Sequence, residues 1–358
     1  MSARDPFQLV GTTIDGKYRI EEVVGVGGSS VVYRAVHEGF GDAEVAVKCL
    51  RPPENFSAEG RAAFFGTFRK EGKLLLRLSS EPGIVRVLDL GVTTAPTSAR
   101  VPFLVLEWLE GSTLADLLSE RQRHGLGPFS EREALLLLRE IATAVVSAHS
   151  LEHAKGRGVA HRDLKPSNVM QTESARGPVW KVLDFGIAKA MQAGDHATAA
   201  SGTPVNVRVF SPLYGAPEQF HAVYGPTGPW TDVHALGLIL IELVTGARAF
   251  EGNDFSELFK SAAAKKRPTP RARGARVSDE LEELCARAIA LKPADRYADA
   301  GQLVAAIDAI VQRTSVSAPA SSRREPRRRW SGSSLAPWLV ALGCVLAVIV
   351  LLALRLVS

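Results

Sequence analysis

The chain has 358 residues, 46% of them hydrophobic and 23% charged, and this ordinary globular composition excludes a disordered or fibrous protein. Its three cysteines, Cys49, Cys285 and Cys344, are far apart, so neither a disulfide framework nor a cysteine zinc site is expected. The net charge of +5 comes from seven arginines after residue 312. Because the part before them is nearly neutral, no nucleic-acid partner is expected.

Short β-branched runs separated by glycines predict strands in the first third of the chain. They are expected over residues 18–20, 31–36 and 44–50, and again near 85–90 and 103–107. A helix is expected over 58–78, where apolar residues recur with helical spacing.

After Gly111 the pattern changes to long helical segments. Helices are expected over 130–153, 232–245 and 279–290, with a last one ending near residue 312. Ser130 and Glu133 have the spacing of a capping box at the start of the first of these helices. A mostly β part followed by a mostly helical part predicts an α+β protein of two lobes.

The C-terminal tail differs from the rest of the chain. Residues 313–334 are rich in Ser, Ala, Pro and Arg, so we expect a basic, disordered linker. No charge occurs from Leu335 to Leu354, and at about 1.5 Å per residue this run spans about 30 Å, the thickness of the hydrocarbon core of a bilayer. A buried or docking helix is the alternative. The run has no amphipathic face, which favours a transmembrane helix over 335–357.

The arginines that precede this apolar run indicate its orientation. By the positive-inside rule they place the folded part in the cytoplasm and the short C-terminus on the far side of the cell membrane, as in a single-pass protein.

A glycine cluster lies between the first two expected strands, at Gly25, Val26, Gly27 and Gly28. Glycines allow backbone N–H groups to approach phosphate oxygens, although alone such a cluster more often marks a simple hairpin. Lys48 ends the strand that follows. Either it is a surface lysine or it binds nucleotide phosphates, with Glu71 of the next helix as its carboxylate partner.

The segment His161–Asn168 (HRDLKPSN) contains the residues that phosphoryl transfer requires. Asp163 can accept the proton of a substrate hydroxyl, and Lys165 can neutralise the transferring group. Asn168 and Asp184, the latter in Asp-Phe-Gly, offer the oxygen ligands that magnesium prefers.

Together with Ala216-Pro217-Glu218, this ordered set resembles the eukaryotic-type (Hanks-type) protein kinase family, and closely its bacterial serine/threonine members. The resemblance covers about residues 18–312. It implies a β-rich N-lobe over 18–109 and a helical C-lobe over 110–312, with ATP between them, while residues 1–17 form an extension.

The resemblance also assigns roles to individual residues. It implies catalytic roles for Lys48, Glu71, Asp163 and Lys165, and it makes Asn168 and Asp184 the ligands of Mg²⁺, or of Mn²⁺ in its place. The implied nucleotide-binding residues are Gly25, Val26, Gly27, Gly28, Val32, Ala46, Lys48, Leu106, Glu107, Leu109 and Met170.

Three matches lie outside the cleft. The resemblance implies that Asp232 holds the catalytic loop, that Arg296 pairs with Glu218, and that Ser211 contacts Asp163 and Lys165. His234 stands where the family often has tyrosine, and Ser30 replaces the third glycine of the glycine cluster. These departures leave every expected catalytic position filled.

The resemblance therefore implies transfer of the γ-phosphate of ATP to Ser/Thr hydroxyls of proteins, the kinase itself included, in membrane-associated signalling. Ser/Thr specificity is implied by Lys165. An expected phosphate on Thr198, Ser201 or Thr203 would pair with Arg162. A catalytically silent membrane scaffold that binds nucleotide is the alternative, but Lys48, Asp163, Asn168 and Asp184 are all present. A small-molecule phosphotransferase would have no use for Ala216-Pro217-Glu218.

Overall fold

The computed structural model describes residues 5–52, 57–153, 156–175, 177–185 and 210–316. The chain divides into a unit of residues 1–315 and a unit of residues 316–358. No helix within the described residues is long and apolar enough to cross a membrane, and the expected span at 335–357 lies outside those residues, as does most of the expected linker.

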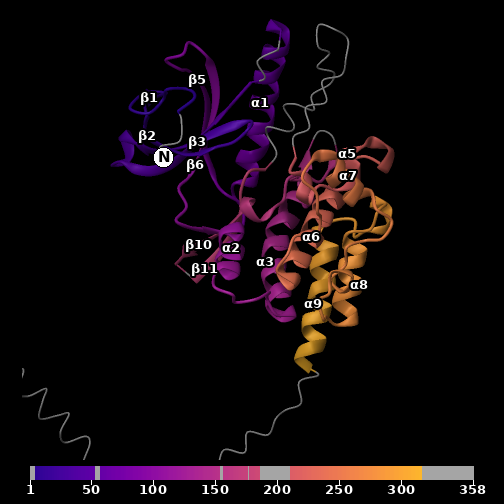
Figure 1. Ribbon diagram of the computed structural model, residues 1–358. Helices are drawn as coiled ribbons and strands as arrows, with labels where there is room; N and C mark the ends of the chain where they lie inside the picture. Colours follow the sequence, from indigo (N-terminus) through magenta and orange to yellow (C-terminus); the bar gives the residue numbers. More distant parts are fainter. Residues whose placement is uncertain (1–4, 53–56, 154–155, 176, 186–209, 317–358) are drawn as a thin grey trace, which may run out of the picture. The chain divides into compact units, whose positions relative to one another are not determined.

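The first part of the folded unit is a six-stranded antiparallel sheet, in the strand order β1-β2-β3-β4-β6-β5 (Figure 1). Its strands are β1 (Thr13–Ile14), β2 (Tyr18–Val26), β3 (Ser30–His37), β4 (Ala43–Leu50), β5 (Val87–Thr94) and β6 (Arg100–Glu107). The expected strands are confirmed, and β1 is an addition to them. Successive side chains on a strand point to opposite faces, so the sheet presents two different surfaces.

One face of this sheet is covered by the N-terminal segment. Phe7, Leu9 and Ile14 are buried in a cluster with residues of β2, β3, β4 and β6. The hydroxyl of Tyr33 in β3 donates a hydrogen bond to Asp5 Oδ1 at 2.6 Å. Residues 5–14, which we expected to form an extension before the domain, therefore pack as part of its first lobe.

The other face packs against helix α1 (Ala58–Leu78), whose bounds are those expected from the sequence. Phe64 and Phe68 of the helix form an apolar cluster with Leu50 of β4 and Leu104 of β6. Helix α1 also contacts β5 (Figure 1). Its first turn is capped by the Ser57 hydroxyl, which accepts from Gly60 N.

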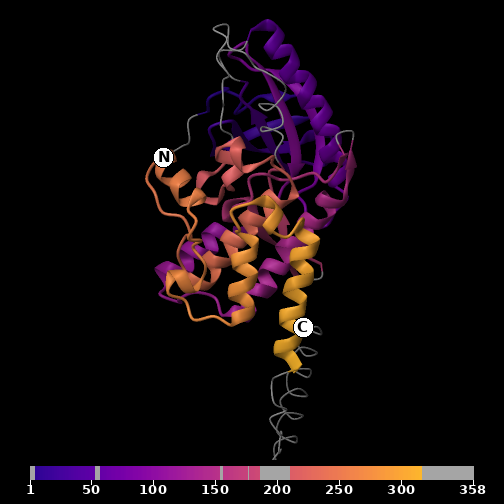
Figure 2. The same cartoon turned by 90° about the vertical axis from the view of Figure 1, so that its right-hand side faces the viewer.

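The second lobe is mainly helical. Its helices are α2 (Leu114–Arg123), α3 (Glu131–Ser150), α5 (Pro217–Phe220), α6 (Pro229–Thr245), α7 (Phe255–Ala263), α8 (Asp279–Ala288) and α9 (Ala300–Val316). Its short strands are β7 (Gly111–Thr113), β8 (Glu152–His153), β9 (Gly156–Arg157), β10 (Val169–Ser174) and β11 (Gly177–Val182). Figure 2 shows α9, in yellow, at the end of the described chain.

Helix α6 lies at the centre of this lobe and contacts both α3 and α8. Every residue from Thr231 to Val244 is buried, because the helix is apolar on nearly all sides. The expected capping box of α3 is confirmed: Ser130 Oγ accepts from Glu133 N, and the Glu133 carboxylate accepts from Ser130 N at 2.9 Å. The α+β architecture expected from the sequence is thus present in the described residues.

The packing of the N-terminal segment gives a stability prediction. Leu9 is 1% exposed, so Leu9→Ala should leave a cavity and lower the free energy of unfolding by about 2–5 kcal/mol. Neighbouring Val10 is 43% exposed, and Val10→Ala should change the free energy of unfolding by no more than about 0.5 kcal/mol. Chemical denaturation of the two variants measures both values. Equal, small losses would show that residues 5–14 contribute nothing to the folded lobe.

Candidate active site

The catalytic loop is held by one buried carboxylate in the first turn of α6. Asp232 Oδ2 accepts from His161 N at 2.6 Å, and its Oδ1 accepts from Arg162 N at 2.7 Å. These two bonds fix the backbone directly before Asp163, where Arg162 has a left-handed conformation with φ +62°. The expected role of Asp232 is therefore confirmed.

His149, near the end of α3, is a third donor to Asp232. Its Nδ1 accepts from Ala300 N at 3.0 Å, so its Nε2 carries the hydrogen and donates to Asp232 Oδ2 at 2.9 Å. Burial alone would raise the pKa of the Asp232 carboxyl, but the hydrogen bonds from His149 and from Arg162 N lower it below the ordinary value. The carboxylate therefore stays ionised. The sequence analysis did not single out His149.

Four of the predicted residues lie together, Asp163 and three residues that contact it. Ser211 N donates to Asp163 Oδ1 at 2.8 Å, and Lys165 Nζ lies 3.3 Å from Asp163 Oδ2. Lys165 Nζ also donates to Ser211 Oγ at 2.7 Å, and Asn168 Nδ2 donates to the Asp163 carbonyl at 2.9 Å. The contacts predicted for Ser211 are confirmed. A lysine and an amide side chain thus both lie within hydrogen-bond distance of Asp163.

Lys48 lies in an ion pair that differs from the expected one. Its Nζ is 2.5 Å from Asp184 Oδ1. Partial burial would raise the pKa of the Asp184 carboxyl, but the charge and hydrogen bond of Lys48 outweigh this effect and lower it. Asp184 has φ +58°, and this left-handed conformation aims its side chain back toward β4.

The expected pair of Lys48 with Glu71 is absent from the described part of the chain, where Glu71 is half-buried on α1 and takes part in no ion pair. One carboxylate at contact distance already neutralises the ammonium group of Lys48, and in this structure that carboxylate belongs to Asp184. The predicted pairing of Glu71 with Lys48 is therefore wrong for this structure, and the catalytic role of Glu71 stays a prediction.

Four of the expected nucleotide-binding residues lie on one face of the sheet. In the strand register Val32 is opposite Lys48, and Ala46 is opposite Leu106, so these four side chains point to the same side. All four are half-buried, in contrast to their fully buried neighbours along the strands. These four side chains therefore lie on the face that α1 covers in part, where they remain accessible to a planar ligand.

The glycine cluster leaves open space beside this face. A Cβ atom built on Gly25 or Gly28 would meet no atom within 4 Å, and one on Gly27 would contact only Ser30. Packing therefore does not require glycine at these positions. Close approach of a phosphate group to the backbone would require it, because a side chain would be in the way. Val26, 48% exposed, ends β2 at the same loop.

Glu107 ends β6, at the expected hinge. Its carboxylate binds Lys181 Nζ of β11 and accepts from Arg86 N at 2.8 Å. Its side chain is thus engaged in joining the two sheets. Leu109 follows in the hinge, half-buried, and Met170 lies in β10 opposite Thr113 and Lys181. The sequence analysis did not anticipate Lys181, although it lies only three residues before Asp184.

The donor set fits magnesium. Asn168 donates from its amide nitrogen to the Asp163 carbonyl, which leaves its side-chain oxygen to act as a metal ligand, and Asp184 offers a carboxylate. Magnesium is typically held by one or two such groups together with substrate phosphates. Among the described residues no cluster of three or more His, Cys, Asp or Glu side chains could hold a metal ion by itself.

A fully buried ion pair supports the segment after the active site. Arg296 Nη1 and Nη2 donate to the two oxygens of Glu218 at 2.8 and 2.9 Å, as predicted. Such a bidentate pair fixes geometry as well as charge. His234 Nε2, close by, accepts from Arg267 at 3.0 Å, so this histidine is a packed interior residue. Thr198, Ser201 and Thr203 lie outside the described residues.

Known proteins share these features. The protein kinase domain family matches residues 18–307. The chain is 32% identical to the serine/threonine-protein kinase PknL of Mycobacterium tuberculosis, over 86% of this chain and 69% of the relative. It is 33% identical to pkn3 of Myxococcus xanthus (87% and 53%) and 30% identical to PrkC of Bacillus subtilis (84% and 41%), so it spans about half the length of these two. The chain therefore belongs to the protein kinase family, among its bacterial serine/threonine members.

Proposed function

We propose that this kinase transfers the γ-phosphate of ATP to serine and threonine hydroxyls of proteins, including its own. The observation that carries the proposal is the position of Asp163, whose Oδ1 is fixed by Ser211 N while Lys165 lies 3.3 Å from Oδ2. The relatives named above, which are called serine/threonine kinases, support this choice of acceptor.

Phosphoryl transfer depends on positioning and on neutralising charge. With Oδ1 held by the backbone, Oδ2 of Asp163 orients the substrate hydroxyl and takes its proton. Lys165, bound between Asp163 and Ser211, places a positive charge where the phosphoryl group passes. Lys48 supplies a second positive charge at the nucleotide phosphates. Magnesium held by Asn168 and Asp184 would neutralise the charge that develops on the phosphate oxygens.

Replacing the base tests this mechanism. Asp163→Asn keeps an oxygen that can accept from Ser211 N but removes the proton acceptor, so kcat should fall about 10²–10⁴-fold while ATP affinity stays close to that of the wild type. Phosphate incorporation into a generic basic protein and nucleotide titration measure the two quantities. Asp295→Asn, at an exposed carboxylate, is the matched control and should keep full activity. Wild-type turnover by Asp163→Asn would refute the assigned role.

Autophosphorylation gives a second test. We propose that a phosphate on Thr198, Ser201 or Thr203 pairs with Arg162 and orders the active site. After incubation with ATP, mass spectrometry should find phosphate on at least one of these residues, and Asp163→Asn should remove it. Full activity of a variant with all three changed to alanine would contradict the proposal.

Membrane attachment through residues 335–357 is part of the same proposal. The uncharged run should partition into lipid, and salt does not screen apolar insertion, whereas it weakens the attraction of arginines to anionic lipid. The full chain should therefore stay in the membrane pellet after a high-salt wash and leave it only with detergent. A chain that ends at Val316, the last residue of α9, should be soluble and active. Release by salt alone would contradict an inserted helix.

A further inference from the structure

The connection between α7 and α8 is strongly basic. From Lys260 to Arg276 the chain has seven lysines and arginines and no acidic residue. Part of this charge is used inside the fold. Arg267 donates to three main-chain carbonyls, of Ala262, Ala264 and Ile289, and Arg271 pairs with Asp279 at 2.6 Å. Arg273, which pairs with Glu251, and Arg276 line cavities on the surface.

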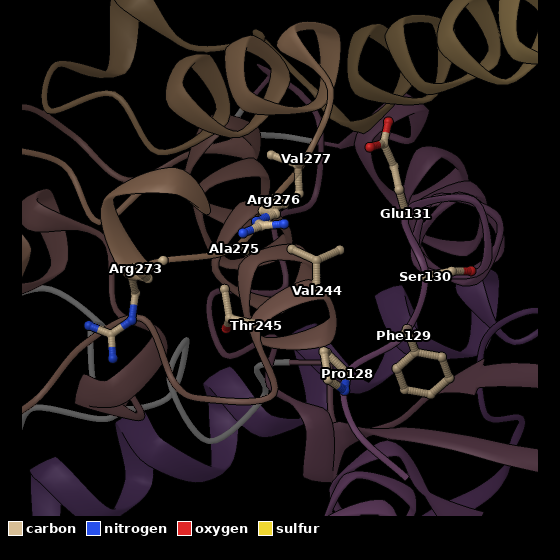
Figure 3. A pocket seen from close by; sticks show the side chains of 11 residues that line it. Pro128, Phe129, Ser130, Glu131, Val244, Thr245, Arg273, Ala275, Arg276 and Val277 are labelled. Carbon is tan, nitrogen blue, oxygen red and sulfur yellow. The ribbon is translucent and has the colours of Figure 1, made fainter.

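Two adjoining cavities lie beside this connection. The larger, of about 970 Å³, lies between α2, the segment before α3 and the end of α6, and the smaller has about 340 Å³. Both are lined by Pro128, Phe129, Thr245 and Arg273, so they are neighbours, and the two together are called the groove. Figure 3 shows the smaller cavity, with Arg273 and Arg276 on one side and Phe129 and Glu131 on the other.

The larger cavity adjoins the catalytic residues. Pro166, directly after Lys165, lines it, as do Leu213 and Tyr214, which follow Ser211 by two and three residues. Since Lys165 and Ser211 both contact Asp163, a polypeptide with its hydroxyl at Asp163 has this cavity beside it. The groove is thus lined in part by residues that lie within one to three positions of Lys165 and Ser211, two of the residues that contact Asp163.

The groove has more arginines than acidic residues, and each of the acidic residues already has a hydrogen-bond or ion-pair partner. Glu242 accepts from the Tyr214 hydroxyl at 2.6 Å, and Glu251 pairs with Arg273 at 2.7 Å. Glu131, in the smaller cavity, accepts from Ser278 N and Oγ at 3.0 and 2.5 Å.

The four arginines that line the groove are Arg121, Arg248, Arg273 and Arg276. Arg121 lies over the Phe129 ring at 4.0 Å and donates to main-chain carbonyls at 3.2 and 3.4 Å. Within the described part of the chain neither Arg121 nor Arg276 forms an ion pair with a carboxylate. Arg248 and Arg276 are exposed.

We infer that this arginine groove, defined by Arg121, Arg248, Arg273 and Arg276, binds an acidic segment of the protein substrate next to its serine or threonine acceptor. The inference rests on the proposed kinase activity. Opposite charges across an interface select partners, and guanidinium groups bind carboxylates through paired hydrogen bonds. The concave groove with Leu118, Phe129 and Phe250 among its lining suits a polypeptide, whose apolar and acidic side chains both find partners there.

The test compares peptides that share one serine acceptor and differ in their flanks, which are acidic, alanine or basic. Fluorescence polarisation gives Kd with the full chain, and phosphate incorporation gives kcat and KM. The acidic peptide should bind at least tenfold more tightly than the alanine peptide, and this difference in Kd should shrink at high salt. Its kcat/KM should be higher than that of the alanine peptide because its KM is lower, while kcat is the same for both. Equal Kd values for the acidic and alanine peptides would overturn the inference.

Charge reversal locates the effect. Arg248→Glu combined with Arg276→Glu should weaken binding of the acidic peptide at least tenfold and leave the alanine peptide and the KM for ATP unchanged. Arg61→Glu combined with Lys292→Glu changes the same charge at exposed positions outside the groove and should have no such effect. Equal losses in both double variants, or equal losses for both peptides, would refute a specific groove.

Two outcomes separate this inference from the proposed activity. Preferential binding of the acidic peptide without phosphate transfer to any peptide or protein would uphold the groove and refute the kinase activity. The second outcome comes from competition for the bound acidic peptide. If anionic lipid vesicles or an oligonucleotide displaced it and an unlabelled acidic peptide without an acceptor did not, the groove would bind another class of partner. The inference would then be wrong.

Discussion

The buried Asp232 carboxylate is the constraint on which the active site depends. It binds His161 N, Arg162 N and the His149 ring, all between 2.6 and 2.9 Å. The left-handed conformation of Arg162 costs about 1–3 kcal/mol. Each hydrogen bond to a charged group contributes about 1.5–3 kcal/mol, so these bonds together outweigh the strain. The carboxylate therefore holds the backbone in the conformation that presents Asp163 to Ser211 N and Lys165.

The same helix organises the substrate side. Asp232 lies in the first turn of α6 and Glu242 near its end, where it accepts from Tyr214 at 2.6 Å. Between them the helix is buried on all sides, so neither carboxylate moves without disturbing the core of the lobe. The loop that carries Asp163 and the segment that carries Tyr214 are thus held by one buried helix, and the proposed phosphoryl transfer depends on such preorganisation.

Much of this arrangement could be predicted from the sequence, because its signals are local or come in a fixed order. Apolar periodicity gave the bounds of α1, and a Ser–Glu capping box marked the start of α3. The resemblance to kinases placed Ser211 and Arg296 correctly. The packing of residues 5–14 was missed, because a two-residue strand and three scattered apolar side chains have no period. Sequence order alone did not show that they cover a sheet face.

The partner of Lys48 shows where such prediction stops. One ammonium group has two acids within the same site, Glu71 on α1 and Asp184 after β11, and sequence spacing is compatible with either. The choice depends on how closely each backbone approaches β4, which tertiary packing decides. In this structure Asp184, with its left-handed backbone, is at 2.5 Å, and Glu71 stays half-buried on its helix. Lys48 and Asp184, which the resemblance to kinases assigns to the nucleotide and its magnesium ion, are thus in contact in this structure. Tertiary packing, and not distance along the sequence, therefore decides which of the two acids pairs with Lys48.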